Sequence, residues 1–158
     1  MSILKEILQF KIDAVTSFIK DPRAAAIEKF VMRFGILRHG RPLPKGYRKG
    51  TIKMCYRNTT NLVLNKRDLT YYEGYALRKG LPIEMRHAWA VDKAGAVVDV
   101  TWRDTSDAEE YLGVPIPVDM MLEHQCLTGY YSVLWAGMLE TPNWDILPKL
   151  EAALVETD

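Results

Sequence analysis

The amino-acid sequence predicts an α+β fold, in which N-terminal helices and a central helix pack on an antiparallel β-sheet. Three observations predict this fold. Apolar side chains recur at helical spacing in the first third of the chain, a stretch without glycine or proline covers residues 54–66, and aromatic or alternating stretches separated by short turns cover residues 70–102. With 158 residues, 48% of them hydrophobic, the chain can bury a substantial core, and we expect a single domain over residues 1–158.

The N-terminal part, about residues 2–35, is expected to be helical. Residues 2–20 place their apolar side chains on one stripe, which predicts a helix packed on the core. Asp21 is a good helix cap and Pro22 suits a first helical position, so a second helix is predicted over 22–33, with Gly35 ending it.

A loop and the central helix follow. Glycine and proline alternate with basic residues over 35–50, a composition typical of a loop. Residues 54–66 then predict a helix, although its threonines and asparagines give it only fair intrinsic propensity, so tertiary packing must stabilise it. Cys55 lies in the first turn of this helix.

The sheet is expected to begin with a meander of three strands. Residues 70–78 are rich in aromatic side chains and predict a strand, with Gly74 as a bulge or a point of close packing. Residues 82–102 predict a β-hairpin, because alternating side chains flank a turn at Lys93, Ala94 and Gly95.

The turn of this hairpin decides which side chains meet. A three-residue loop with Gly95 in the left-handed conformation pairs His87 with Thr101 and Trp89 with Asp99. His87 and Asp99 then share a face as diagonal neighbours, roughly 7–8 Å apart at the backbone, close enough for an imidazole to meet a carboxylate. Asp92, the competing carboxylate, lies on the opposite face in this register.

The remainder of the chain is expected to alternate short elements. We expect a loop over residues 103–110, followed by an extended, proline-containing segment over 111–117. A helix over 118–127, a strand over 129–136 and a closing helix over 143–155 are expected to follow.

Cys55, His87 and Asp99 together predict nucleophilic catalysis. The thiolate is the reactive form of cysteine, and a helix N-terminus or a neighbouring imidazolium favours it. Cys55 would attack an acyl carbon, His87 would take its proton and later protonate the leaving group, and Asp99 would fix the imidazole tautomer. This interpretation requires that the face of His87, and not that of Ala88, look onto the start of the Cys55 helix.

The same residues resemble the transglutaminase-like superfamily, whose members have a papain-like fold. The resemblance lies in a cysteine that opens a helix, the His87-Ala88-Trp89 motif on a strand, and the Asp99-Val100-Thr101-Trp102 motif on the next. It covers about residues 50–102, which would be the catalytic core. It implies a cysteine hydrolase, peptidase or acyltransferase that acts on an amide, a peptide bond or a glutamine side chain. The reaction would pass through a thioester on the cysteine and would need no metal or cofactor. The substrate would be a peptide or a protein.

The oxyanion hole is less complete than in the family, since the loop before Cys55 contains no glutamine. The Cys55 amide is one candidate donor, and Tyr47 is a candidate second. Trp89, opposite Asp99, is a candidate wall of the substrate cleft. Cys126 has no comparable partner motif and is expected in the core.

Two other hypotheses stay open. Residues 1–98 carry 19 Lys and Arg against 8 Asp and Glu, whereas residues 99–158 carry 2 against 12. An inactive transglutaminase-like module could therefore bind nucleic acid or an acidic protein through the basic region 38–53. Acyl transfer from a thioester donor such as coenzyme A is the other alternative.

Composition excludes several classes of protein. Two cysteines are too few for a disulfide framework, and with three histidines they form no metal-ligand spacing. No apolar run approaches the roughly 20 residues that span a bilayer, so no membrane partner and a cytoplasmic location are expected. The sequence does not predict the oligomeric state.

Overall fold

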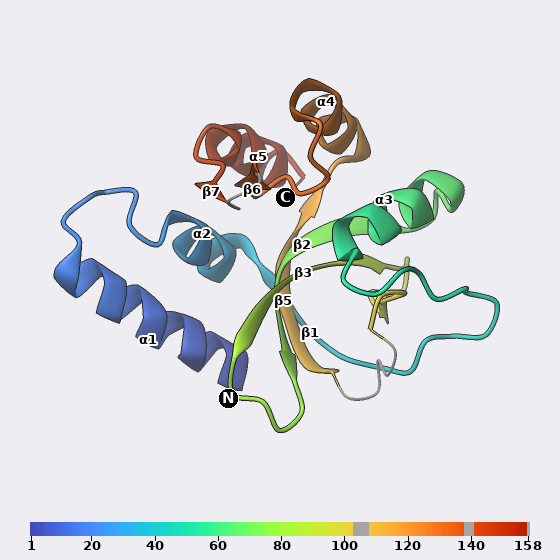
Figure 1. Ribbon diagram of the computed structural model, residues 1–158, viewed down its shortest axis with the longest axis horizontal. Helices are drawn as coiled ribbons and strands as arrows, with labels where there is room; N and C mark the ends of the chain where they lie inside the picture. The colour runs from blue at the N-terminus through green and yellow to red at the C-terminus, as the bar shows by residue number, and fades with distance from the viewer. Residues whose placement is uncertain (103–107, 138–140, 158) are drawn as a thin grey trace.

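The computed structural model describes residues 1–102, 108–137 and 141–157, and it has a mixed α+β fold. One antiparallel sheet of five strands, in the order β1-β5-β2-β3-β4, forms its centre, and a pair of very short strands, β6 and β7, lies apart from it. In the view of Figure 1, α1 and α2 lie to the left of the strands, α3 lies to their right, and α4 and α5 lie together above them, although all five helices pack on the same face of the sheet.

The helices are α1 (Ile3–Phe18), α2 (Ala26–Phe34), α3 (Cys55–Asn65), α4 (Val118–Thr128) and α5 (Ile146–Val155). The strands are β1 (Ile36–His39), β2 (Thr70–Arg78), β3 (Glu84–Val91), β4 (Val97–Val98), β5 (Ala108–Ile116), β6 (Trp135–Ala136) and β7 (Thr141–Pro142). In the part of the chain that the structure describes, no helix is long and apolar enough to cross a membrane.

The start of α1 is fixed to the sheet by Glu110 of β5. Ser2 caps the helix, because its hydroxyl accepts a hydrogen bond from the Lys5 amide. One carboxylate oxygen of Glu110 in turn accepts from the Ser2 hydroxyl at 3.0 Å and from the Leu4 amide at 2.7 Å. The negative charge of Glu110 therefore lies at the positive end of the helix, where it is favourable.

The second helix begins later than predicted. The Asp21 carboxylate accepts from the amide of Arg23 and closes a turn instead of capping a helix. Ala25 then adopts a left-handed backbone with φ 54°, and α2 starts at Ala26. The prediction that Asp21 caps this helix is therefore wrong, because α2 begins five residues after it.

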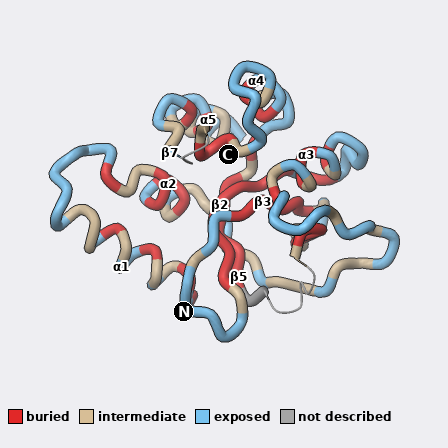
Figure 2. Tube along the Cα trace, in the orientation of Figure 1, coloured by how far each residue is buried: buried red, intermediate tan, exposed pale blue. Residues whose placement is uncertain are grey.

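The strand β2 occupies the centre of the sheet and has the predicted bounds. It pairs with β3 on one side and with β5 on the other, and Figure 2 shows these three strands as the most continuously buried part of the chain. Gly74 is a point of close packing, as predicted, since a Cβ atom there would lie 2.2 Å from the Leu112 carbonyl oxygen.

Two paired strands, β1 and β5, were not predicted as such. The segment at 111–117 was expected to be extended, and residues 108–116 form β5, which pairs with β2 and also with β1. Residues 36–39 were predicted as loop because the surrounding composition is rich in glycine, proline and basic residues. Of the predicted loop at 103–110, residues 103–107 lie outside the described part of the chain.

The β3–β4 hairpin has the predicted register. Ala90 pairs with Val98, Val91 pairs with Val97, and the Asp92 amide donates to the Ala96 carbonyl. Gly95 has φ 82°, the left-handed conformation that the three-residue turn requires. The second arm is shorter than predicted, because β4 ends at Val98 and Asp99 follows it.

Two packed clusters lie on opposite faces of the sheet. One joins all five helices to one face, and it includes Cys55, Val63, Ala88 and Ala90. The other is smaller and largely aromatic, and it contains Tyr72, Ala76, Trp89, Val91, Val97 and Tyr111, with Trp102 packed against it. His87 alternates with Ala88 along β3 and therefore belongs to the face of the aromatic cluster.

The predicted strand at 129–136 is largely replaced by a loop held by Glu73 of β2. This carboxylate is fully buried, and it accepts hydrogen bonds from the amides of Val133 and Leu134 at 2.7 and 2.9 Å. It also accepts from the hydroxyls of Tyr71 and Ser132. Because a side chain takes up these amides, only residues 135–136 pair with another strand.

Candidate active site

His87 and Asp99 form a buried pair at the end of the hairpin. The imidazole Nε2 lies 2.7 Å from Asp99 Oδ2, and each residue is only 2% exposed. The hairpin register explains this contact, because His87 and Asp99 are diagonal neighbours on one face. The predicted dyad is therefore present in the structure.

Asp99 is held by three further hydrogen bonds. Its second carboxylate oxygen accepts from the amide of Thr101 at 2.9 Å and from that of Trp102 at 3.4 Å, and Oδ2 also accepts from the Tyr111 hydroxyl at 2.9 Å. Burial acts to raise the pKa of Asp99, but the charge of His87 and these hydrogen bonds outweigh it, so the pKa lies below its ordinary value of 3.8.

Cys55 completes the group. It is the first residue of α3 and is buried, and it lines the same cleft as His87, close enough to contribute to the raised pKa of that imidazole. With Nε2 engaged by Asp99, Nδ1 is the nitrogen left for the sulfur. Burial acts to lower the pKa of His87, but the charge of Asp99, the hydrogen bond to Asp99 and the nearby Cys55 raise it well above 6.5. The imidazole is therefore cationic at neutral pH.

The route by which the three residues meet differs from the prediction. Ala88 and Ala90, not His87, pack in the same cluster as Cys55 and Val63, so the body of α3 lies on the Ala88 face of the sheet. The expectation that the His87 face, and not that of Ala88, looks onto the start of α3 is wrong, since Cys55 itself packs in the cluster that contains Ala88. Cys55 nevertheless reaches His87, because it lies at the very start of the helix and β4 pairs only with the last two residues of β3.

The chain just before Cys55 is tied to the segment that follows Asp99. The Gly50 amide donates to the Val100 carbonyl at 2.7 Å. Asn58 of α3 donates both to the Thr51 carbonyl and to the Thr101 hydroxyl, at 2.8 and 3.0 Å. These contacts fix the cysteine-bearing turn relative to the aspartate.

A cleft of about 690 Å³ opens beside these residues. Its lining includes Lys53, Cys55, Arg78, Arg86, His87 and Trp102. The Trp102 ring stacks on the His87 imidazole with centroids 4.3 Å apart, and the Arg78 guanidinium lies 5.4 Å from the Trp102 ring centroid. Trp102, and not Trp89 as predicted, thus forms a wall of the cleft.

Two sequence candidates lie outside this cleft. Trp89 is fully buried and packs near Tyr72 and Tyr111, so it cannot line a substrate site as expected. Tyr47 packs against the helix-side core, and the Lys66 ammonium lies 4.8 Å from its ring centroid. It is not among the residues that line the cleft, so its role as an oxyanion donor stays a prediction.

Three contributing residues were not assigned to the site from the sequence. Tyr111 comes from the segment whose pairing was missed, and Asn58 was counted only as a weak helix former. Trp102 was named only as part of the motif that begins at Asp99, and no signal in the sequence distinguished it from Trp89.

The basic region 38–53 is partly used inside the protein. Arg41 donates to the Val97 carbonyl at 2.7 Å and pairs with Asp92 at 2.9 Å. Arg38 donates to the Gly95 carbonyl, and its guanidinium lies over the Tyr72 ring. Both arginines thus stabilise the hairpin through contacts within the protein, so these two side chains are already engaged without an external anion.

Cys126 and His124 are not among the residues that line the cleft. Cys126 is exposed, so its expected place in the core is wrong. His124 is buried, with Nε2 2.8 Å from the Ser132 carbonyl oxygen. Among the described residues no group of three or more His, Cys, Asp and Glu is placed to hold a metal ion.

Comparisons with known proteins give no match: no family model, no curated protein and no solved structure corresponds to this chain.

The low pKa of Asp99 predicts a pH-dependent effect of Asp99→Asn. A carboxyl whose pKa is depressed by folding contributes stability above its unfolded value of 3.8 and loses it as the pH falls through the folded value. Asp99→Asn should lower the free energy of unfolding at neutral pH by about 3 kcal/mol, because it leaves a buried histidine without its charged partner. Urea titrations of the wild type and of Asp99→Asn should show that the difference between their free energies of unfolding becomes smaller at acidic pH.

The matched control is Asp68→Asn, since Asp68 is exposed just before β2. It should change the free energy of unfolding by less than about 0.5 kcal/mol at every pH. An Asp99→Asn protein as stable as the wild type at neutral pH would contradict the ion pair with His87.

Proposed function

We propose that the protein is a cysteine-dependent hydrolase or acyltransferase of the transglutaminase-like, papain-like type. The observation that carries the proposal is the buried contact of 2.7 Å between His87 and Asp99, with Cys55 and His87 lining one cleft. The order of these residues along the chain and the motifs around them resemble that superfamily. The substrate class would be an amide, a peptide bond or a glutamine side chain in a peptide or protein.

The first half of the reaction would form a thioester. The Cys55 sulfur attacks the acyl carbon while His87 holds the thiol proton, and a carbon–sulfur bond forms. The carbon–nitrogen bond then breaks, and the amine leaves with the proton from His87. Asp99 keeps the imidazole oriented and stabilises its charged form, for which the 2.7 Å contact is suited.

The second half would return the enzyme to its starting state. A water molecule gives a proton to His87 and attacks the thioester carbon. The carbon–sulfur bond breaks and the carboxylic acid leaves, and His87 keeps the proton taken from water beside the released sulfur. An amine in place of water would give transamidation by the same steps. Hydrolysis is favoured because water is always available and no dedicated amine site is evident in the described cleft.

The oxyanion of each tetrahedral intermediate needs hydrogen-bond donors. Cys55 is the first residue of α3, where backbone amides have no partner within the helix. Its own amide is therefore the candidate donor, and the helix dipole adds to the stabilisation.

The test uses p-nitrophenyl acetate, an activated ester that reports acyl transfer to any reactive thiol. Cys126→Ala protein should release a rapid burst of nitrophenolate followed by slower turnover, as the thioester forms and then hydrolyses. Cys55→Ala protein that keeps Cys126 should show no burst, because Cys126 has exposure but no imidazole partner among the contacts described. Equal bursts from the two single variants would overturn the proposal.

Adding hydroxylamine distinguishes the acceptors. If hydroxylamine can reach the thioester, it should form a hydroxamate and raise the turnover rate, which indicates an acyltransferase. If it cannot, the turnover rate should stay at the value found with water, which indicates a hydrolase. Both results require the burst that depends on Cys55.

A further inference from the structure

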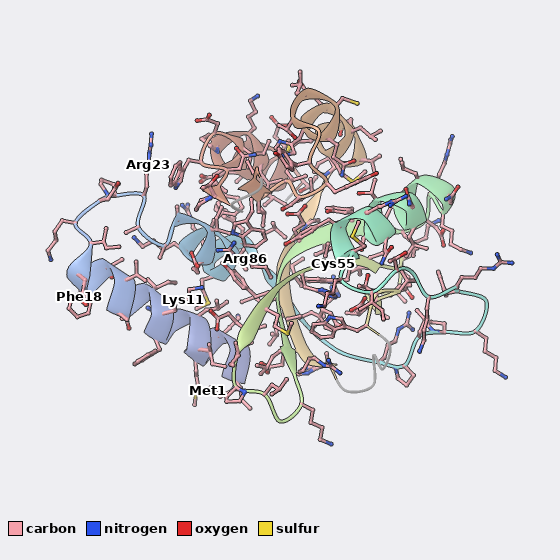
Figure 3. The ribbon with its side chains drawn as sticks, viewed as in Figure 1. Met1, Lys11, Phe18, Arg23, Cys55 and Arg86 are labelled. Atoms are coloured by element: carbon pink, nitrogen blue, oxygen red, sulfur yellow. The ribbon has the colours of Figure 1, made fainter. Side chains whose placement is uncertain are left out.

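Three positively charged side chains line the cleft beside Cys55. Lys53, Arg78 and Arg86 are among its lining residues, and within residues 1–102, 110–137 and 141–157 no Asp or Glu lines it. Asp99 lies behind His87 and is buried. Figure 3 labels Cys55 at the start of α3 and Arg86 apart from it, on the other side of the strands in this view.

Arg78 is fixed close to the reacting groups. Its guanidinium lies over the Trp102 ring, and that ring stacks on His87. A guanidinium held on an aromatic face keeps its N–H groups directed sideways, where they can bind a carboxylate or phosphate with two parallel hydrogen bonds.

Lys53 is held by the backbone turn that leads into α3. It has φ 64°, a left-handed conformation that non-glycine residues seldom adopt. Such conformations persist where the surrounding structure enforces them, often at functional sites. This turn places the ammonium group two residues before the nucleophile, on the wall of the same cleft.

The remaining walls of the cleft are apolar or aromatic. Ile52 and Met85 lie in the lining together with Tyr56 and Trp102. Low-dielectric walls strengthen the attraction between the cationic side chains and an anion. The cleft therefore combines apolar contact area with a net positive charge, a combination suited to an acyl compound that also carries a negative group.

We infer that the substrate of this cleft is an acyl compound with an anionic group, a carboxylate or a phosphate, near the acyl carbon that Cys55 attacks. Arg78 and Lys53 bind that group. The inference rests on the proposed function, since it uses Cys55 as the reacting atom, and it adds the charge of the substrate.

The test compares two alkylating agents that differ in charge. Iodoacetate is anionic and iodoacetamide is neutral, and both transfer a carbon to the Cys55 sulfur with loss of iodide. In Cys126→Ala protein the ratio of the iodoacetate rate to the iodoacetamide rate should fall about fivefold on Arg78→Gln and on Lys53→Asn. Asparagine tolerates the left-handed backbone at position 53. Raising the salt concentration should lower the ratio in the parent protein.

Arg67→Gln is the matched control, since Arg67 is exposed beyond the far end of α3. It should leave the ratio unchanged, and Arg78→Lys should restore part of it. A ratio that is the same in the parent, Arg78→Gln and Lys53→Asn proteins overturns the inference. That failure is distinct from failure of the proposed function, which would appear as iodoacetamide alkylation that does not depend on His87.

Competition identifies the anion. Glutarate and inorganic phosphate are each added at constant ionic strength during iodoacetamide alkylation, with chloride as the reference. Slowing by glutarate alone assigns a carboxylate to the substrate, and slowing by phosphate alone assigns a phosphate group.

Discussion

His87→Ala is expected to lower the rate at which iodoacetamide alkylates Cys55 at neutral pH by on the order of 100-fold. The imidazole lines the same cleft as the thiol and is cationic, because the charge of Asp99 holds the pKa of His87 well above 6.5 in spite of burial. A cationic neighbour favours the thiolate, which is the form that reacts, and proton transfer by a positioned histidine contributes about 10²–10⁴-fold to such reactions.

This comparison is made in Cys126→Ala protein, because Cys126 is exposed and would react with the reagent. His39→Ala is the matched control, since His39 is exposed at the end of β1. It should keep the rate of the parent. Equal rates in the His87→Ala and parent proteins would show that the histidine does not activate Cys55.

Glu73→Gln is expected to lower the free energy of unfolding by about 3 kcal/mol. The carboxylate is the acceptor for the Val133 and Leu134 amides and for the hydroxyls of Tyr71 and Ser132. Glutamine has one acceptor oxygen, and its NH₂ group would face two of these donors. A buried donor left without a partner costs about 1–3 kcal/mol.

Glu73 also gives the stability a pH dependence that the variant should lack. Burial raises the pKa of Glu73 to about 7, although its hydrogen bonds act to lower it. A group whose pKa is raised by folding contributes stability below its unfolded value of 4.5, and that contribution is lost as the pH rises toward 7. Urea titrations across this range should show the difference between wild type and Glu73→Gln narrowing as the pH rises.

Glu123→Gln, at an exposed position of α4, should change the free energy of unfolding by less than about 0.5 kcal/mol. A Glu73→Gln protein within that limit would contradict the role of Glu73 as the anchor of the loop before β6.

The hairpin could be predicted from the sequence because its information is local. Gly95 fixes the turn, the turn fixes the register, and the register places His87 beside Asp99. The helix at Cys55 could likewise be predicted, since no glycine or proline interrupts it. These elements carry the three proposed catalytic residues.

The missed features depend on contacts between distant parts of the chain. β1 exists because β5 pairs with it, and no pattern within 36–39 indicates a strand. The loop at 132–134 follows Glu73, a buried carboxylate in a strand that was described only by its aromatic residues. Likewise, Trp89 and Trp102 could not be told apart by sequence, since only the packing shows that one is buried and the other lines the cleft.

The most direct measurement is peptide mapping of protein quenched in acid during the p-nitrophenyl acetate burst. Low pH preserves a thioester, so mass spectrometry of the digest locates the acetyl group. We predict that it lies on the peptide that contains Cys55, and that His87→Ala protein carries far less of it. Acetyl groups found only on Cys126 or on lysines would contradict catalysis by Cys55.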